Sequence, residues 1–188
     1  TKVAPAKGHL GTTVVIEGER LLAGAADLSK VTLAGVQATY KAGSGSDTKV
    51  TVTSNKGTNA GNAGDVVLEA STGAVLTLAK AFTHVADGEI TKVAPATGQA
   101  GTTVEITGKN MLGGGTKITS VTLVGVEVTS IASSSDTSVK VVVKTKASAG
   151  KGDVILTADT GAIVTGKDLF TYVDVQKITK IDPAKGQV

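Results

Sequence analysis

Residues 90–111 read ITKVAPATGQAGTTVEITGKNM, and this stretch decides the fold because the chain repeats it. Between Thr1–Gly18 and Thr91–Gly108, 13 of 18 positions are identical. The 3 prolines of the chain all lie in this phrase, as Pro5, Pro95 and Pro183, with offsets of 90 and then 88 residues. A repeat of that length is too long for a solenoid unit and suits a small domain that folds alone.

The repeat continues beyond the opening phrase, since Gly64-Asp65-Val66 returns as Gly152-Asp153-Val154. We therefore predict two domains, residues 1–88 and 89–177, followed by the first strand of a third repeat at residues 178–188. A lone first strand cannot bury its own apolar side chains. It predicts a longer array with repeats on both sides of this chain, or a strand, Ile178–Val188, that packs on a neighbouring molecule by β-augmentation.

Within each repeat the apolar period is two. Val14 and Ile16 alternate with positions that tolerate charge, because Glu105 replaces Val15 in the second copy. This alternation predicts strands with one face in a core and one face in water. Further strands are expected at Lys30–Leu33, Val36–Tyr40, Lys49–Thr53, Asp65–Ala70 and Val75–Val85.

About seven short strands per repeat, separated by turns rich in Gly, Ser and Asn, predict all-β, immunoglobulin-like β-sandwich domains. The short junctions between repeats predict that these tandem domains form a rod. Residues Glu19–Leu28 have helical propensity, but their counterpart contains Gly113-Gly114-Gly115. We expect a loop there, with at most one turn.

The stretch Ile90–Met111 resembles the opening of an IPT/TIG domain, which typically reads I-x-x-I-x-P-x-x-G-x-x-G-x-T-V-x-I-x-G-x-N-L/F. The closing Phe170–Val173 is similar to the family's last strand, F-x-Y. The first repeat departs from the pattern twice, with Arg20 in place of Asn and His84 in place of Tyr. The resemblance covers nearly the whole of each repeat and implies tandem immunoglobulin-like domains.

Composition excludes several classes of function. With 0 Cys, neither a disulfide scaffold nor a thiolate metal site can form. The net charge of +3 comes from scattered Lys and a single arginine, Arg20, so no nucleic-acid footprint is expected. No apolar run in this segment reaches the ~18 residues of a membrane span.

The sequence offers no catalytic constellation. His9 and His84 become Gln99 and Tyr172 in the second repeat, so no histidine site is shared. No G-x-S-x-G nucleophile elbow occurs. We expect His84 to substitute for an aromatic core residue beside Phe82.

Three other clusters are interpreted as structural. The segment Gly113–Lys117 lacks the order of a phosphate-binding loop and is expected to be a hairpin loop. Asp87 and Glu89 could hold calcium at the junction between repeats, but too few oxygen ligands accompany them. The last cluster, Asn59, Asn62 and Asp65, is typical of a turn. We therefore predict no catalytic, cofactor-binding or metal-binding residues and no cofactor.

The outward-facing positions carry many Thr residues, which favour strands and could also accept O-glycans. They are Thr32, Thr51, Thr53, Thr103, Thr122 and Thr157. Four apolar residues share that outward parity and could form lateral contacts: Val15, Val67, Val142 and Ile155. No N-glycosylation sequon is present.

The leading functional hypothesis is a non-enzymatic structural or adhesive module of an extracellular or cell-surface repeat array, which could form a filament. Its partners would be neighbouring repeats, copies of the same protein, or surface glycans and other proteins. The alternative is a carbohydrate-binding accessory module of a larger surface protein. Sugar platforms use exposed aromatic faces, and Tyr40 is the plausible one.

Overall fold

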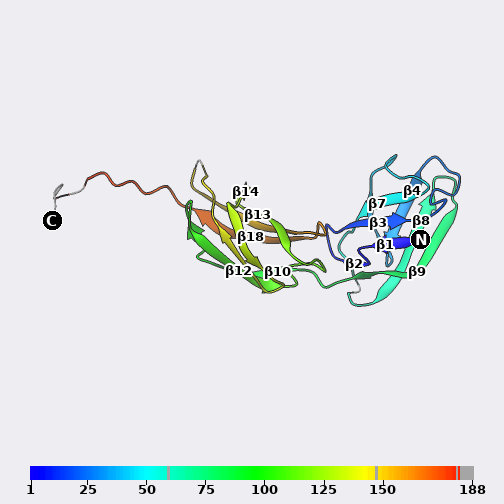
Figure 1. The fold of residues 1–188 in the computed structure, drawn as a ribbon, viewed down its shortest axis with the longest axis horizontal. Helices are drawn as coiled ribbons and strands as arrows, with labels where there is room; N and C mark the ends of the chain where they lie inside the picture. Colours follow the sequence, from blue (N-terminus) through cyan, green and yellow to red (C-terminus); the bar gives the residue numbers. More distant parts are fainter. Residues whose placement is uncertain (59, 147, 181, 183–188) are drawn as a thin grey trace.

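The structure, a computed structural model, describes residues 1–58, 60–146, 148–180 and 182. Strands and loops account for all of these residues, and none of them belongs to a helix that could cross a lipid bilayer. Two β-sandwiches lie end to end (Figure 1), the first spanning Lys2–His84 and the second Glu89–Tyr172. The predicted all-β, immunoglobulin-like fold is confirmed.

The first sandwich packs a four-stranded sheet, ordered β1-β3-β7-β6, on a five-stranded sheet, ordered β2-β9-β8-β4-β5. Its strands are β1 (Lys2–Ala4), β2 (Lys7–Gly8), β3 (Thr13–Glu17), β4 (Leu28–Leu33), β5 (Val36–Gln37), β6 (Thr39–Tyr40), β7 (Lys49–Thr53), β8 (Ala63–Ala70) and β9 (Val75–His84).

The second sandwich repeats this topology, with sheets ordered β10-β12-β16-β15 and β11-β18-β17-β13-β14. Its strands are β10 (Glu89–Ala94), β11 (Thr97–Gly98), β12 (Thr103–Lys109), β13 (Ile118–Leu123), β14 (Val126–Glu127), β15 (Ser130–Ser134), β16 (Ser138–Val142), β17 (Gly150–Ala158) and β18 (Ile163–Tyr172).

Two short segments of the first repeat divide between the sheets. Pro5, which follows a cis peptide bond, separates β1 from β2, and each lies at an edge, as a residue without an amide donor requires. The prediction of one strand over Val36–Tyr40 is wrong. Ala38 is buried, and its amide donates to the carbonyl of Val31, so β5 and β6 join opposite sheets on either side of it.

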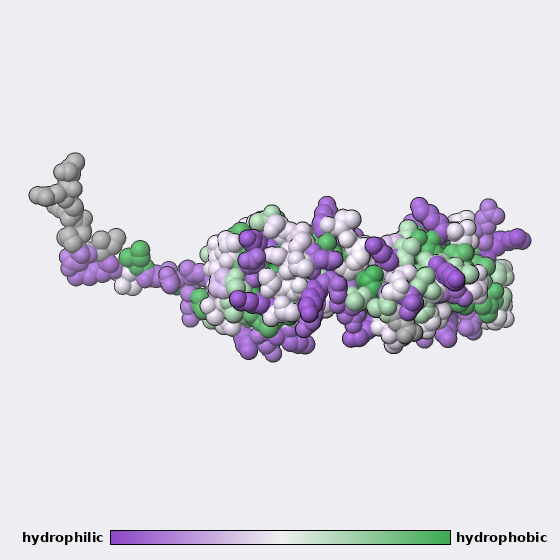
Figure 2. Space-filling model, turned by 90° about the horizontal axis from the view of Figure 1, so that it is seen from below, coloured by the Kyte–Doolittle hydropathy of each residue, from purple (hydrophilic) through white to green (hydrophobic). Residues whose placement is uncertain are grey.

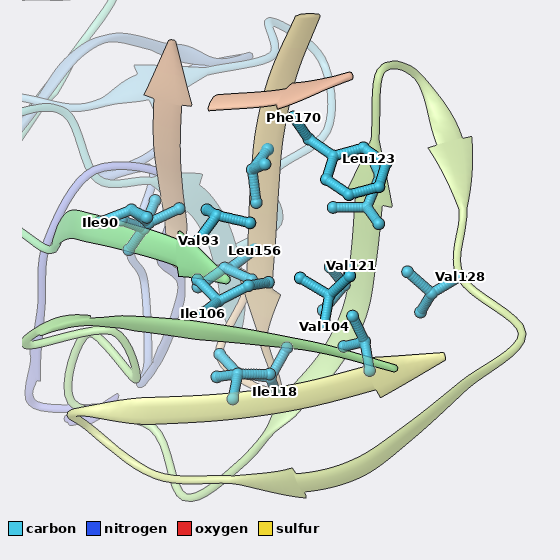
Figure 3. Packing of buried hydrophobic residues seen from close by; sticks show 14 of the residues in the cluster. Ile90, Val93, Val104, Ile106, Ile118, Val121, Leu123, Val128, Leu156 and Phe170 are labelled. Carbon is cyan, nitrogen blue, oxygen red and sulfur yellow. The ribbon is translucent and has the colours of Figure 1, made fainter. Parts of the chain in front are cut away.

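Each core is a layer of aliphatic side chains around one phenylalanine. Phe82 and Phe170 are 1% and 0% exposed, which confirms their predicted place. Ile106 and Phe170 come from opposite sheets and point into the space between them (Figure 3). Residues 19–27 form a loop of turns and bends that buries Leu21, and Leu28 begins β4.

The Gly-Asp-Val motif shared by the repeats shapes a bulge in the last strand. The amide of Lys80, a residue with φ of 48°, donates to Asp65 Oδ1 at 2.9 Å. The amide of Asp168, with φ of 52°, donates to Asp153 Oδ1 at 3.0 Å. At each bulge the backbone amide no longer bonds to the neighbouring strand, and a carboxylate accepts its hydrogen bond instead.

Of the strand expected at residues 178–188, only residues 178–180 and 182 lie within the described chain. Ile178 is 79% exposed, and residues 178–180 pair with no other strand. The salt bridge between Lys180 and Asp182 is local and exposed.

Candidate functional site

The histidine singled out in the last strand of the first repeat lies in the core. His84 is 1% exposed and meets Phe82 edge-on, with ring centroids 5.2 Å apart. Its Nε2 donates to the carbonyl of Leu33 at 2.9 Å. In the second sandwich Tyr172 meets Phe170 in the same way at 5.3 Å, so the histidine takes the place of an aromatic core residue.

The glycine-rich segment Gly113–Lys117 is a loop organised around Asp159. Asp159 accepts hydrogen bonds from the amide and the hydroxyl of Thr116. The hydroxyl bond, with the amide bond second, lowers the pKa of Asp159. A side chain at Gly115 would overlap the Asp159 carboxylate, since its Cβ would lie 2.3 Å from Oδ1. The loop therefore surrounds an acid of its own chain.

Two of the acidic residues considered as ligands, Asp87 and Asp65, have partners within the fold. Asp87 forms a salt bridge with Lys56 at 2.8 Å, and this raises the pKa of Lys56. Asp65 caps the bulge of β9. Asn59 lies outside the described residues. Within the described chain, no three His, Cys, Asp or Glu side chains converge as metal ligands would.

The aromatic residue considered as a sugar platform holds a loop together. The Tyr40 hydroxyl donates to Asp27 Oδ1 at 2.5 Å and accepts from the amide of Gly45 at 3.0 Å. Asp27 Oδ2 accepts from the amide of Gly43. The Tyr40 bond lowers the pKa of Asp27, and desolvation raises the pKa of Tyr40. The ring is half-buried, so it does not present a free face.

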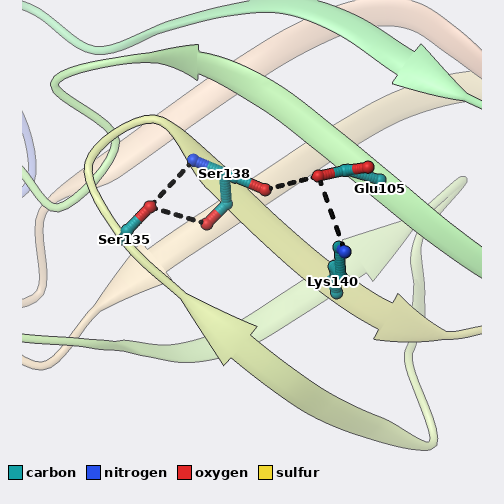
Figure 4. Close-up of polar contacts among 4 residues, drawn as sticks. All are labelled: Glu105, Ser135, Ser138 and Lys140. Atoms are coloured by element: carbon teal, nitrogen blue, oxygen red, sulfur yellow. Dashed lines mark hydrogen bonds and ion pairs between the residues drawn. The ribbon is translucent and has the colours of Figure 1, made fainter.

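The outward parity is correct, and its residues are spread over the sheets. Glu105 points to Ser138 and Lys140 on β16 (Figure 4), with the Ser138 hydroxyl donating at 2.9 Å. Val15 pairs with Thr51 across β3 and β7 and is half-buried. On the face shown in Figure 2, apolar and polar residues are interspersed.

The structure brings together a group of residues at the junction of the sandwiches that the sequence did not single out. We call residues 9–13, which lead from β2 into β3, the tail loop, and residues 158–163, which lead from the end of β17 into β18, the head hairpin. The amide of Thr13 donates to the carbonyl of Thr160 at 2.8 Å, and the amide of Ile163 donates to the carbonyl of Leu10 at 3.0 Å. These two bonds join the sandwiches in strand-like fashion.

Glycines allow the two sandwiches to approach closely. A Cβ at Gly11 would lie 2.8 Å from the Gly161 carbonyl oxygen. A Cβ at Gly88, in the connecting segment, would lie 2.2 Å from a methyl carbon of Val164. A Cβ at either position would force neighbouring atoms to shift, because real Cβ atoms essentially never make contacts under 3.0 Å.

His9 is buried at the junction, where it lines a hollow of about 200 Å³ together with Leu10 and Val164. It is 1% exposed, and its Nδ1 donates to the Leu10 carbonyl at 3.0 Å, since a carbonyl can only accept. Nε2 has no hydrogen-bond partner among the described residues. A Cβ at Gly113 would lie 2.2 Å from this nitrogen, so the imidazole packs directly on the Gly113 backbone.

The connecting segment is held as well. The Asn110 amide group donates to the Asp87 carbonyl at 3.3 Å, and the amide of Val85 donates to the carbonyl of Gly8. One sequence signal could have revealed this junction: the repeats differ where the sandwiches meet, with His9 against Gln99 and Gly113 against Ala23. These contacts hold the two sandwiches in one preferred orientation.

With this geometry in view, comparison with known families is decisive. The family model described as the IPT/TIG domain matches residues 89–172. Residues 89–172 form an IPT/TIG domain. The first sandwich has the same strand order and the same opening phrase as this domain.

The chain is also similar to several solved structures. The full extracellular region of plexin A4 is 20% identical with a TM-score of 0.59, and the match covers 97% of this chain and 16% of that chain. The surface glycan-binding protein SGBP-B of Bacteroides ovatus gives 18% identity and a TM-score of 0.36, over 87% of this chain and 41% of that one. The γ-CGTase of alkalophilic Bacillus clarkii gives 18% identity and a TM-score of 0.40, and the match covers 58% of this chain and 17% of that one.

Of these three, the plexin structure has the score that indicates a shared fold. The chain spans 16% of that plexin region and 41% of the B. ovatus protein. A search of curated proteins gave no match.

Proposed function

We propose that this chain is a non-enzymatic structural module of an extracellular or cell-surface repeat array, in which IPT/TIG sandwiches stack end to end as a spacer or filament. The observation that carries this proposal is the junction, where two backbone hydrogen bonds and a set of close glycine contacts fix one sandwich on the next. A module that only had to tether two domains would not need such contacts.

The connecting segment supports the same function. Four residues separate β9 from β10, and the Asn110 side chain holds the Asp87 carbonyl within that segment. A linker this short and this well anchored permits little free rotation. A stiff connection transmits extension along an array, which is what a structural repeat must do.

The polar residues that could have carried chemistry support it as well. Asp65 and Asp153 cap bulges, Asp159 organises a loop, and Asp27 binds the Tyr40 hydroxyl. These carboxylates stabilise the fold through hydrogen bonds and are not gathered in a cavity. We propose that the adhesive partners are neighbouring repeats or copies of the same protein.

The experiment is 15N NMR relaxation on the whole chain, together with a glycan array. We expect both sandwiches to report the same anisotropic tumbling, with a correlation time suited to one elongated body, and the array to show no binding. Independent tumbling of the two sandwiches would contradict the structural module. Strong and specific binding to one glycan class would favour a carbohydrate-binding accessory module instead.

A further inference from the structure

We propose that the chain carries both halves of a second junction at its opposite ends, and that a second copy docks there tail to head. The surface at residues 99–103 of one copy would receive the surface at residues 70–75 of another. This inference rests on the proposed function and names the contact by which the array would grow.

Residues 99–103 are the tail loop of the second sandwich, and they have the conformation that residues 9–13 have in the first. The amide of Gln99 donates to Thr102 Oγ1 at 3.1 Å, matching the bond from His9 to Thr12 Oγ1 at 3.1 Å. Gly101 has φ of 84°, close to the 88° of Gly11. A Cβ at Gly101 would meet no described atom within 4 Å, whereas one at Gly11 would strike the head hairpin. The loop is preformed and open.

Residues 70–75 are the head hairpin of the first sandwich, and they match residues 158–163 of the second. The amide of Ala70 donates to the Ala74 carbonyl at 2.8 Å, as Ala158 does to Ala162 at 2.9 Å. Gly73 has φ of 86°, and a Cβ there would also meet no described atom within 4 Å.

Burial shows that this hairpin lacks its partner. Ala162 is 1% exposed in the junction, while its counterpart Ala74 is exposed. Ile163 is 40% exposed, and its counterpart Val75 is 62% exposed. The head hairpin of the first sandwich therefore presents small apolar residues to solvent at the positions that the junction covers in the second.

A hollow lies beside this hairpin, lined by Glu19, Arg20, Ala23, Gly24 and Leu76. The corresponding surface of the second sandwich receives His9 on Gly113 and Gly88 on Val164. At the open ends, Gln99 stands for His9 and Ala23 for Gly113. In the docked pair, the methyl of Ala23 would face the flexible Gln99 side chain of the other copy in place of an imidazole ring. The smaller demand of Gln99 for space thus compensates for the added methyl. Arg20 replaces Asn110 and is likewise a hydrogen-bond donor.

The chemistry of the connecting segment favours a second copy over a covalently continued sandwich as the occupant. The connecting segment can pass Val164 only because Gly88 has no side chain. Gln176 occupies the equivalent position after the second sandwich. A chain that continued along the same path would place the Gln176 side chain in that contact. A separate molecule contributes only its loop and hairpin, and the amide of Gln176 is held by Gln99 Oε1 at 3.1 Å.

Such a contact is heterologous, because two different surfaces meet. After each docking step one tail loop and one head hairpin stay free, at opposite ends of the assembly. Heterologous contacts that do not close into a ring extend into filaments. Without a covalent linker to raise the effective concentration, the contact should be weak and visible mainly when protein is concentrated.

The test uses the absence of cysteine from the chain. Two full-length variants, Val75→Cys in the head hairpin and Ala100→Cys in the tail loop, are mixed at high concentration under mild oxidation. The control pairs Ala100→Cys with Thr51→Cys, an exposed residue on the side of the first sandwich. We expect the head–tail mixture to form mixed disulfide dimers about tenfold faster than the control mixture.

A third variant checks that the contact itself matters: Ala74→Glu added to Val75→Cys should return the rate to that of the control. Thermal melts verify that each variant is folded. Equal rates in the test and control mixtures, or no effect of Ala74→Glu, would overturn the inference. Common tumbling of the two sandwiches in such a chain would leave the proposed structural module intact, so the two failures are distinguishable.

Discussion

At the scale of single residues, the contact between His9 and Gly113 decides how the sandwiches fit. Ala23 takes φ of 51° where Gly113 takes 55°, so an alanine is compatible with this backbone. The backbone strain of an alanine at Gly113 is only about 1 kcal/mol, but its methyl would lie 2.2 Å from His9 Nε2 and 2.6 Å from the Ala162 Cβ. We expect the two sandwiches to tumble separately in 15N relaxation.

The matched control recreates the pair found at the open ends. Adding His9→Gln to Gly113→Ala should restore common tumbling, because glutamine can bend away from the methyl. Ala23→Gly, the same exchange in reverse at a surface without a partner sandwich, should leave the tumbling unchanged. If Gly113→Ala tumbles as one body, the imidazole contact does not fix the orientation.

The two core phenylalanines allow a second prediction at this scale. Phe82→Ala and Phe170→Ala should each lower the free energy of unfolding of their own sandwich by about 3–5 kcal/mol. Urea denaturation followed by NMR signals from each sandwich separates the two transitions, as a single two-state fit cannot. Equal loss in both sandwiches from one substitution would show that they unfold as a unit.

Sequence reasoning located these core residues and missed the junction. Phe82 and His84 share strand parity, so alternation alone placed both in the core. No local pattern marks Gly88 or Gly161, because their close contacts are with a different sandwich. Local patterns report which face of a strand is buried, and they carry little information about which distant loop covers a glycine.

At the scale of elements, the alternation of apolar residues and the Gly-, Ser- and Asn-rich turns predicted most of the strands around the core. It could not show that Val36–Tyr40 divides between sheets, because β5 and β6 have only two residues each and alternation over so short a run is uninformative. The bulge of the last strand was also hidden. Its cause is a carboxylate on the neighbouring strand, and that pairing is set by tertiary structure.

The bulge of β18 leads to a prediction about pH. The hydrogen bond from the Asp168 amide, the largest cause, lowers the pKa of Asp153. A carboxyl with a lowered folded-state pKa stabilises the fold fully above its unfolded value, and this contribution disappears as the pH falls through the folded value. Stability should therefore decline below about pH 4. Asp153→Asn should flatten that decline, measured by urea midpoints from pH 2 to pH 6.

The control for this experiment is Asp174→Asn, at an exposed position after β18. It removes the same charge without touching a bulge, so its acid profile should follow that of the unmodified protein. An Asp153→Asn profile that also follows it would mean that other carboxylates account for the acid response.

At the scale of the whole molecule, stability should not depend on metal ions or on redox state. The chain has no cysteine, and Asp87, the acid at the junction, is paired with Lys56. Thermal melts with EDTA, with calcium and with a reductant should superimpose on the melt in buffer alone. A shift of several degrees with calcium would indicate a site at Asp87 and Glu89.

The shape of the molecule carries the final prediction. Strands of 8–10 residues such as β8 and β9 run along each sandwich, and at ~3.3 Å per residue plus loops each sandwich should add roughly 35–45 Å to the length. Because the junction bonds hold the sandwiches end to end (Figure 1), dilute small-angle scattering should give a single elongated particle of two such lengths. Raising the concentration should lengthen the particle while its cross-section stays constant, since head-to-tail docking adds copies along the axis. A compact particle at low concentration would contradict the stacked junction, and growth of the cross-section would show that copies associate through their sides.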